Sequence, residues 1–441
     1  MPSCAHTSVL CVNFMPFASL GLSPALVHAA SLLGFTAPTP IQEAAIPAIL
    51  QGSDLLGAAQ TGSGKTAAFA LPVLQHWQMG AGAGGPRRVR ALVLVPTREL
   101  AAQVGEVLRS LAQHLTTPPK VAIIFGGVSI NPQMMGLRGG ADIVVATPGR
   151  LLDLVEHNAL RLGTVAHLVL DEADRLLDLG FAEELQRVLA LLPPQRQNLL
   201  FSATFPPAVQ GLVDGLLKNP VRVEVPHTPG NEPDIAQRAI AVDASRRTQL
   251  LRHLLKEHKW PRVLVFVATQ YAAEHVAEKL YKAGVFATPF HGGLSQGARN
   301  QVLQEFKDDR WQVVVTTDLA ARGIDIAQLP AVVNYDLPRS AVDYVHRIGR
   351  TGRAGESGTA VSFVTADAEA HFQLIEKRQH LSLPREQIAG FESTEVAQMP
   401  AKSLDPDGTG GVKGKRPSKK DKLRAAAAAA DDADSPNNLS G

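Results

Sequence analysis

Short runs of apolar residues recur along the chain and alternate with segments that have helical spacing. In the first half, a polar cluster or a pair of glycines closes nearly every run. Apolar strands that alternate with helices are typical of a parallel sheet covered by helices on both faces. We therefore expect an α/β domain with strands at 54–57, 90–95, 121–125, 142–146, 167–170 and 198–201.

A proline-rich break at 226–234 ends this first alternation. It holds three prolines and a glycine, which is typical of a linker. Beyond it the alternation restarts, and we expect strands at 262–267, 286–290, 312–315, 331–334 and 359–364. The pattern predicts two tandem α/β domains, at 17–225 and 235–385. Residues 17–50, ahead of the first strand, are expected to form a helix, a turn and a second helix.

The composition places the chain among globular proteins. Its 441 residues are 45% hydrophobic and 19% charged, which fits two or three domains with packed cores. No apolar run approaches the roughly 20 residues that cross a bilayer, and the N-terminal segment lacks the basic stretch of a secretory signal. Cys4 and Cys11 are the only cysteines in the sequence, so neither a disulfide framework nor a zinc site is expected. We expect a cytoplasmic monomer.

Both ends of the chain lack the alternating pattern. Residues 1–16 carry no recognisable signal, and Met15 is a candidate for the true start. Residues 386–441 form a low-complexity tail that we expect to be disordered. Within it, 409–424 holds seven Lys or Arg and one Asp, whereas the whole chain has a formal net charge of only +2. We favour an electrostatic tether for nucleic acid over a merely solubilising end.

The stretch Ala58–Thr66 joins a predicted strand to a predicted helix and matches the phosphate-loop pattern, with Ala59 in place of the first glycine. Gly62 and Gly64 allow backbone N–H groups to point inward at a phosphate, and the following helix adds its N-terminal dipole. Lys65 is expected to reach the β- and γ-phosphates. The residues expected to bind nucleotide are Ala59, Gln60, Thr61, Gly62, Ser63, Gly64, Lys65 and Thr66.

A second element supports the phosphate loop. The apolar run 167–170 ends in Asp171-Glu172, as expected for the Mg²⁺ element of a P-loop NTPase. Asp171 is expected to hold Mg²⁺ through water, together with the Thr66 hydroxyl, and Glu172 to act as the base for the attacking water. The alternative is an exposed helix N-terminus that favours acids for its dipole.

Other polar clusters also follow predicted strands. In open α/β sheets the functional residues lie at the carboxyl ends of the strands. Capping of strand ends explains one such cluster but is a poor explanation of several. The clusters are Pro96–Leu100, Gly126-Gly127, Thr147–Arg150 and Ser202–Thr204.

Two further segments remain open to alternatives. Phe35 and Gln42 could stack on adenine and read its edge, but core packing and a helix cap explain them equally well. Arg347, Arg350 and Arg353 are spaced three apart and could supply arginine fingers to a γ-phosphate. A solvated basic turn, or phosphate contacts with nucleic acid, would give the same spacing.

Taken in order, these motifs identify the chain as similar to the DEAD-box family of ATP-dependent RNA helicases, and most similar to the bacterial RhlE-type members. The similarity covers roughly residues 17–380. It includes Asp171–Asp174, which reads D-E-A-D in one-letter code and gives the family its name. Ala59 is normal for this family. The other matching segments are Phe17, Gly34–Gln42, Ala58–Thr66, Pro96–Ala101, Gly126-Gly127, Thr147–Arg150, Ser202–Thr204, Val263–Thr269, His291-Gly292, Gln296, Arg299, Thr317–Asp325 and His346–Arg353.

The resemblance implies two RecA-like domains with ATP between them. It implies that Phe35 and Gln42 select adenine, and that Ser202 and Thr204 link the ATP state to RNA binding. In the second domain Asp325 would contact the ribose, Arg350 and Arg353 would be the fingers, and His346 would pack against the Mg²⁺ motif. The residues implied to contact RNA are Thr97, Arg98, Gly127, Thr147, Arg150, Gln296, Arg299 and Thr317.

The implied activity is RNA-stimulated ATP hydrolysis, coupled to closure of the two domains on RNA and to local unwinding of short duplexes. The cofactors would be ATP and Mg²⁺, and RNA contact in the core would not be sequence-specific. An ATP-gated RNA clamp or assembly chaperone would use the same residues, and a DNA helicase would share the two-domain plan. Proteins of ribosome assembly or RNA decay are candidate partners.

Overall fold

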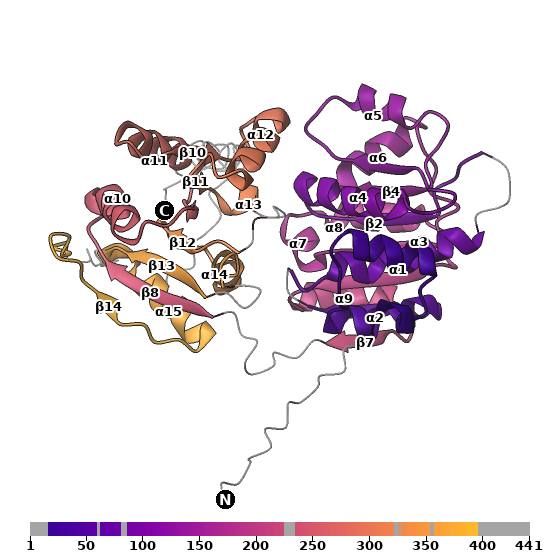
Figure 1. The fold of residues 1–441 in the computed structure, drawn as a ribbon, viewed down its shortest axis with the longest axis horizontal. Helices are drawn as coiled ribbons and strands as arrows, with labels where there is room; N and C mark the ends of the chain where they lie inside the picture. The colour runs from indigo at the N-terminus through magenta and orange to yellow at the C-terminus, as the bar shows by residue number, and fades with distance from the viewer. Residues whose placement is uncertain are drawn as a thin grey trace, which may run out of the picture. The chain divides into compact units, whose positions relative to one another are not determined.

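The computed structural model describes residues 16–59, 62–80, 86–224, 234–321, 326, 328–352 and 357–395. Two sheets, each with its own helices, make up this part of the chain (Figure 1), and we call them the first and the second lobe. The elements of the first lobe are η1 (Phe17–Leu20), α1 (Pro24–Leu32), α2 (Pro40–Leu50), β1 (Leu55–Ala58), α3 (Lys65–Gly80), β2 (Ala91–Leu94), α4 (Arg98–Ala112), β3 (Val121–Ile124), α5 (Ile130–Gly136), β4 (Ile143–Ala146), α6 (Pro148–Glu156), β5 (His167–Leu170), α7 (Ala173–Asp178), α8 (Ala182–Ala190), β6 (Gln197–Ser202), α9 (Pro207–Leu216) and β7 (Val221–Glu224).

The second lobe repeats the alternation of strands and helices. Its elements are β8 (Ile235–Ala241), η2 (Ala244–Arg246), α10 (Arg247–His258), β9 (Val263–Phe266), α11 (Gln270–Lys282), β10 (Ala287–Phe290), α12 (Gln296–Lys307), β11 (Val313–Thr316), α13 (Asp318–Ala321), β12 (Ala331–Asn334), α14 (Ala341–Ile348), β13 (Gly358–Val364), η3 (Ala366–Ala368), α15 (Glu369–Gln379) and β14 (Arg385–Glu386).

Within the described residues, each lobe has a seven-stranded sheet in which every pair of neighbours is parallel. The strand orders are β3-β4-β2-β5-β6-β1-β7 and β10-β11-β9-β12-β13-β8-β14. The α/β fold with two parallel sheets is therefore confirmed. Parallel pairing brings the carboxyl ends of the strands to one edge, so Ala58 at the end of β1 lies opposite Ser202 at the end of β6.

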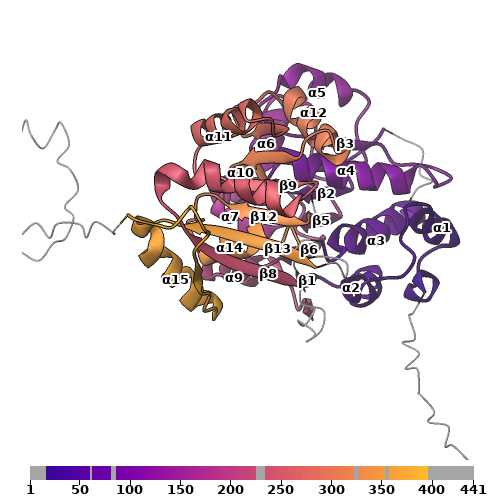
Figure 2. The same ribbon diagram turned by 60° about the vertical axis from the view of Figure 1, so that its left-hand side comes forward.

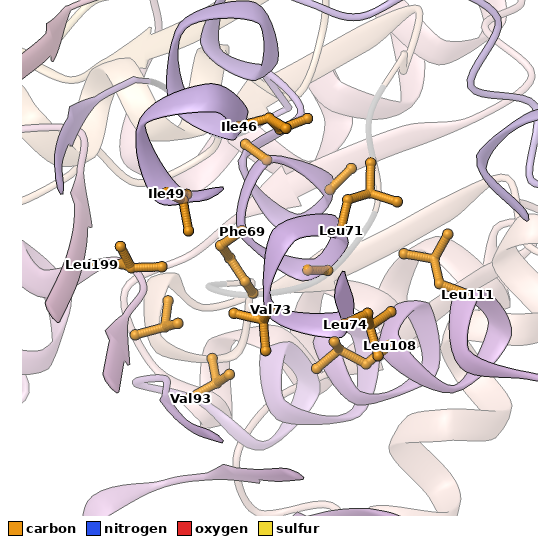
Figure 3. Close-up of a cluster of buried hydrophobic side chains, with 14 of the residues drawn as sticks. Ile46, Ile49, Phe69, Leu71, Val73, Leu74, Val93, Leu108, Leu111 and Leu199 are labelled. Carbon is orange, nitrogen blue, oxygen red and sulfur yellow. The ribbon is translucent and has the colours of Figure 1, made fainter. Parts of the chain in front are cut away.

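Both faces of the first sheet are buried, as its continuous apolar strands predict. On β2, Val93 packs into the cluster beneath α2, α3 and α4 (Figure 3), whereas Leu92 and Leu94 pack into a second cluster with α6, α7 and α8. Phe69 of α3 lies against Phe201 of β6, with 5.5 Å between the ring centroids. This packing fixes the helix that follows the phosphate loop against β6, the strand that ends at Ser202.

The second sheet is covered in the same way. Helices α10 and α11 pack into one cluster, and α12 to α15 supply buried residues to two others. Figure 2 shows α10 and α11 over one part of this sheet and α15 beside β8. No helix in the described ranges is long and apolar enough to span a membrane.

The structure contains three strands that the apolar pattern did not predict. β7 and β14 are edge strands, and only one of the four β7 residues is buried. β8 interrupts its apolar residues with Gln237 and Arg238. Short or polar strands at or next to a sheet edge bury too little apolar surface to give a clear signal.

The packed part of the second lobe also continues beyond residue 385, where the sequence placed the start of the tail. Arg238 of β8 pairs with Glu386 at 2.6 Å. Asp243 accepts hydrogen bonds from the backbone N–H groups of Thr394 and Glu395, at 2.8 and 2.9 Å. Ile388 and Phe391 pack against the core. The described fold therefore extends to residue 395, while residues 226–233 of the expected linker and the tail from 396 lie outside the described residues.

Candidate active site

The phosphate loop lies at the carboxyl end of β1 and leads into α3. Gly62 and Gly64 have φ values of 86° and 93°, in the region that side chains disfavour. Lys65 is buried, and its ammonium group donates to the carbonyl of Ala59 at 2.9 Å. The lysine therefore already reaches across the loop to the strand end. Gln60 and Thr61 lie outside the described residues.

Gln42 connects the second helix to this loop. Its Oε1 accepts from the backbone N–H of Thr39 at 3.0 Å, which makes it the N3 residue of a capping box on α2. Its Nε2 donates to the carbonyl of Gly64 at 3.0 Å, and Thr39 Oγ1 donates to the carbonyl of Ser63 at 2.8 Å. The helix-cap interpretation of Gln42 is thus present in the structure. A contact with adenine stays a prediction.

Phe35 is half-buried and packs against the core cluster that also contains Phe69. Core packing, the alternative for this residue, therefore accounts for part of its surface. Its stacking on adenine stays a prediction.

The acidic strand end is buried rather than exposed. Asp171 follows β5 with 2% of its surface accessible, and burial raises its pKa to about 6, while nearby Lys65 opposes that shift. Glu172 adopts a left-handed φ of 53° as the first residue before α7. The alternative of a solvated helix N-terminus is therefore wrong for this pair.

Glu172 has one oxygen with no hydrogen bond. Its Oε2 lies 3.5 Å from Arg175 Nε, and both side chains are buried. Among the described residues no group donates a hydrogen bond to Oε2. A buried carboxylate oxygen without a donor requires an explanation. The role of Glu172 as the base for an attacking water stays a prediction.

Asp174 ties the acidic segment to Ser202–Thr204. Its Oδ2 accepts from the backbone N–H and the hydroxyl of Thr204, at 3.0 and 2.8 Å. Ser202 Oγ accepts from the backbone N–H of Asp174 at 3.3 Å and donates to the carbonyl of Thr204 at 2.7 Å. The predicted coupling residues therefore contact the acidic motif directly.

The first-lobe residues expected to contact RNA lie at neighbouring strand ends. Arg98 packs against Gly127, where a Cβ would collide with its guanidinium. Arg150 Nη2 donates to the carbonyl of Val128 at 2.7 Å, and its buried Nη1 has no partner among the described residues. Thr97 caps α4 through a 3.3 Å bond from Leu100 N, and Thr147 is buried at the start of α6. These contacts position the cluster, and its binding to RNA stays a prediction.

Two of the three second-lobe candidates are paired with the first lobe. Glu99 lies 3.0 Å from Arg299 Nη2 and accepts a 3.3 Å bond from Gln296 Nε2. Arg299 and Glu99 are both buried, and burial lowers the pKa of Arg299 while Glu99 opposes that shift. Thr317 is half-buried ahead of α13. In this arrangement Arg299 is covered rather than presented to a ligand.

The arginine-rich segment also reaches the acidic motif. His346 Nδ1 is hydrogen-bonded to Arg175, and burial together with the Arg175 charge lowers the pKa of His346 to about 3. Arg350 is buried and lines a small pocket with Arg175 and His346. Arg353 and Asp325 lie outside the described residues.

The third arginine of this segment, Arg347, is held within the second lobe. It pairs with Asp318 at 2.5 Å and donates to Asn334 Oδ1 and the carbonyl of Asp336, at 3.1 and 2.6 Å. Arginines at equal spacing in the sequence therefore have different environments: Arg350 lines a pocket with Arg175, whereas Arg347 is bound within the second lobe.

Sequence reasoning assigned no role to Glu99 or Arg175. Arg175 stands three residues after Glu172, a spacing that brings two side chains together on a helix. Glu99 follows Arg98 in the first turn of α4, but its partners lie almost two hundred residues away. Only the three-dimensional structure reveals that pairing.

A phosphate loop, a buried acidic strand end and a second sheet that supplies an arginine segment define a two-lobed P-loop NTPase. Family models match both lobes: DEAD/DEAH box helicase over residues 39–212, and helicase conserved C-terminal domain over 246–355. The chain belongs to the DEAD-box family of ATP-dependent RNA helicases and is an ATPase.

Individual relatives agree with this assignment. The chain is 39% identical to the ATP-dependent rRNA helicase RRP3 of Gibberella zeae, over 86% of this chain and 78% of that protein. It is also 39% identical to the ATP-dependent RNA helicase DeaD of Buchnera aphidicola, over 84% of this chain, but spans only 60% of the length of that relative. Dbp5 of S. cerevisiae bound to RNA and ADP BeF3 superposes with a TM-score of 0.74 and 31% identity, covering 84% of this chain and 95% of that chain.

Proposed function

We propose that this chain couples ATP binding and hydrolysis to closure of its two lobes on a single RNA strand, and that closure melts short duplexes locally. The observation that carries the proposal is the path from His346 through Arg175 to Glu172. A side chain of the second lobe thereby supports the proposed base of the first. The Dbp5 complex with RNA and a nucleotide analogue supports RNA as the polymer.

ATP would bind at the phosphate loop. Lys65 would exchange its bond to the Ala59 carbonyl for the β- and γ-phosphates, and the N–H groups near Gly62 and Gly64 would donate to phosphate oxygens. Glu172 would accept the proton of the attacking water. Arg350 and Arg353 would stabilise the charge that develops on the γ-phosphate, an effect worth about 10³–10⁵ in rate.

The residues at the loop fit Mg²⁺ as the accompanying ion. Asp171 is buried and its pKa is raised, so a cation nearby would favour the ionised carboxylate. No group of three or more acidic, His or Cys side chains converges among the described residues, but Mg²⁺ with a nucleotide usually needs only one or two protein ligands. Asp171 and Thr66 would hold it, and when bound it would neutralise charge on the phosphates.

RNA would contact both lobes through its backbone. Thr97, Arg98, Gly127, Thr147 and Arg150 would form the first-lobe side, and Gln296, Arg299 and Thr317 the second. Arg299 would exchange part of its pairing with Glu99 for phosphate. Backbone contacts of this type do not read sequence, whereas contacts to the 2′-hydroxyl would discriminate RNA from DNA.

The test is ATPase activity titrated with RNA and with DNA of the same sequence. We expect RNA to raise kcat and to tighten ATP binding, and a non-hydrolysable ATP analogue to tighten RNA binding by the same factor, because coupling between two binding sites is reciprocal. ATPase activity that is equal with and without RNA would contradict the proposal. Equal stimulation by DNA would leave the coupling intact but overturn the choice of RNA.

Finer assignments within the family are proposals of the same kind. The matching motifs support an RhlE-type member, whereas the relatives described above carry the names DeaD and RRP3. We also propose the cytoplasm as the place of action and proteins of ribosome assembly or RNA decay as partners. Crosslinking the protein to RNA in cells, followed by sequencing of the bound fragments, identifies the pathway.

A further inference from the structure

A cavity of about 820 Å³ opens on the second lobe and shares no lining residue with the active site. Ligand pockets of proteins typically measure about 300–1,000 Å³, so its size is sufficient for a nucleotide. Helix α10 and the residues that follow it form much of its wall, and Ala283, Val285, Gln312 and Phe391 complete it.

The cavity is framed by positive charge. Arg252, Lys256 and Lys259 line it at spacings of four and three residues along α10 and its C-terminal end, so their side chains point to the same side. All three are exposed. No residue of the described chain forms an ion pair or side-chain hydrogen bond with them, and none of the lining residues is acidic. Glu257 of the same helix pairs with His253, at 3.5 Å, and not with these three cations. Three neighbouring cations without an ion-pair partner favour an anionic ligand.

Aromatic rings lie among these cations. Trp260 and Phe391 line the cavity, and the His258 ring stacks on Trp260 with 4.6 Å between centroids. His253 also lines the cavity, and its ring lies 5.3 Å from that of Phe391. Rings interleaved with positive charge are the platform on which proteins stack the bases of single-stranded nucleic acid.

Phe391 is held in place before any ligand binds. Asp243 accepts from the hydroxyl groups of Ser393 and Thr394, at 3.0 and 2.9 Å. The backbone N–H of Glu395, together with the donors of Thr394 and Ser393, lowers the pKa of Asp243 to about 2, although burial opposes that shift. Arg246 lies over the Phe391 ring, 5.2 Å from its centroid. The aromatic wall is therefore preorganised, which lowers the entropy lost on binding.

We propose that this cavity binds a single-stranded segment of RNA outside the main RNA site. Phosphates would lie against Arg252, Lys256 and Lys259. A base would stack on the half-buried ring of Phe391, because Trp260 is buried beneath His258. The inference rests on the proposed function only in taking RNA as the polymer. An acidic peptide would satisfy the cations but leave the rings without a stacking partner.

The test compares two triple variants of the full chain. The first is Arg252→Ala, Lys256→Ala, Lys259→Ala. The control, Lys279→Ala, Lys377→Ala, Arg378→Ala, removes the same charge from exposed positions of α11 and α15 that do not line the cavity. Fluorescence anisotropy measures binding of a single-stranded oligouridine of about 20 nucleotides, longer than the 4–16 that one strand-binding fold typically covers.

We expect the cavity variant to bind about ten-fold more weakly than the control at low salt. The slope of log affinity against log salt should be smaller in magnitude by about 2 for the cavity variant than for the control, because each of the three lost phosphate contacts contributes about 0.7 to that slope. The kcat of ATP hydrolysis at saturating RNA should stay unchanged. Photo-crosslinking of the wild type with a 4-thiouridine form of the same RNA should label the peptide 249–261.

Equal affinity and equal salt dependence of the two triple variants would overturn the site, as would crosslinks confined to other peptides. These outcomes are separate from failure of the proposed function. If RNA does not stimulate the wild-type ATPase, the proposed function fails, while the comparison of the two variants still decides whether the cavity binds RNA.

Discussion

Arg175 is the residue that links the proposed base to the second lobe. Its guanidinium lies 3.5 Å from Glu172 Oε2 and is hydrogen-bonded to His346. Asp174, one position earlier, holds Thr204. The acidic motif therefore has one residue that faces the second lobe and another that faces the segment proposed to relay the ATP state.

Glu172→Gln is expected to abolish turnover and to retain ligands. The amide keeps the shape of the side chain but cannot accept a proton, so kcat should fall by about 10²–10⁴. ATP and RNA binding should persist and give a long-lived RNA complex, measured by filter retention with ATP. Glu183→Gln, an exposed change on α8, is the control. Rapid release of RNA from the Glu172 variant in ATP would count against its role as base.

Thr204→Val is expected to separate ATP hydrolysis from unwinding. It removes the 2.8 Å bond from Thr204 Oγ1 to Asp174, and a hydrogen bond to a charged group is worth about 1.5–3 kcal/mol. Strand displacement should fall much more than RNA-stimulated ATPase, measured on the same preparation. Thr204→Ser keeps the hydroxyl and should keep both activities. If both activities fall equally in the valine variant, Thr204 serves the ATP site alone.

At the scale of single residues, the sequence predicted what is local. Lys65 lies within one short motif, and Asp171 and Glu172 stand next to each other in another, so their chemistry is visible in the order of residues. The pairing of Glu99 with Arg299 joins segments two hundred positions apart and leaves no local trace. The sequence also showed no sign of the environment of Arg347, because its partners come from the end of β12, the residues just after it and the first residue of α13.

Helix α2 is the element that supports the phosphate loop. Its first turn is closed by Thr39 and Gln42, and the same two side chains hold the carbonyls of Ser63 and Gly64. A Cβ at Gly64 would lie 2.5 Å from Gln42 Nε2, so this contact also requires a glycine. One capping box therefore serves both the helix and the nucleotide loop.

Substitution of Gln42 can separate these two roles. Gln42→Ala removes the cap and the loop contact, and should lower stability by about 1 kcal/mol, or about 2–4 °C in Tm for a domain of this size. Gln42→Glu keeps an acceptor for Thr39 but loses the donor to Gly64 and places a charge beside its carbonyl. It should keep Tm within a degree or so of the wild type yet weaken ATP binding.

Calorimetry with and without nucleotide measures both effects. An equal loss of ATP affinity in the two variants, without any difference in Tm, would show that the cap contributes nothing. Unchanged ATP affinity in both variants would remove Gln42 from the nucleotide site.

The elements themselves were predictable to different degrees. The central strand β2 is apolar and buried throughout, and β5 is so after its first residue, His167, so their positions follow from the sequence. The edge strand β7 exposes three of its four residues, and both residues of the edge strand β14 are half-buried, so these strands depend on pairing with a neighbour. Their existence is a property of the sheet rather than of their own residues.

At the scale of the whole molecule, the two lobes meet through groups whose charge state matters. His346 in contact with Arg175 has a pKa of about 3, whereas an exposed histidine titrates near 6.5. The lowered pKa means that the contact requires neutral His346. The contact is therefore fully present above about pH 6.5 and is weakened progressively as the pH falls toward 3.

Closure of the two lobes on RNA should therefore become less favourable as the pH falls. Between about pH 7.5 and 5.5, RNA affinity in a non-hydrolysable ATP analogue should fall about ten-fold through this histidine, since one proton contributes up to a factor of ten per pH unit below 6.5. His346→Gln should flatten that part of the profile. Other groups titrate in both proteins, so the difference between their profiles isolates His346. Identical profiles would show that His346 is not buried against Arg175 in the closed state.

The central claim is that ATP and RNA together bring the two lobes into one active site. Single-molecule energy transfer tests it in a Cys4→Ser, Cys11→Ser chain labelled through Glu183→Cys on α8 and Lys377→Cys on α15, both exposed. We expect a high-transfer state that is populated only when a non-hydrolysable ATP analogue and RNA are both present, and that is lost in Arg350→Ala. Hydrolysis of ATP at the RNA-stimulated rate without any change in transfer would contradict the claim.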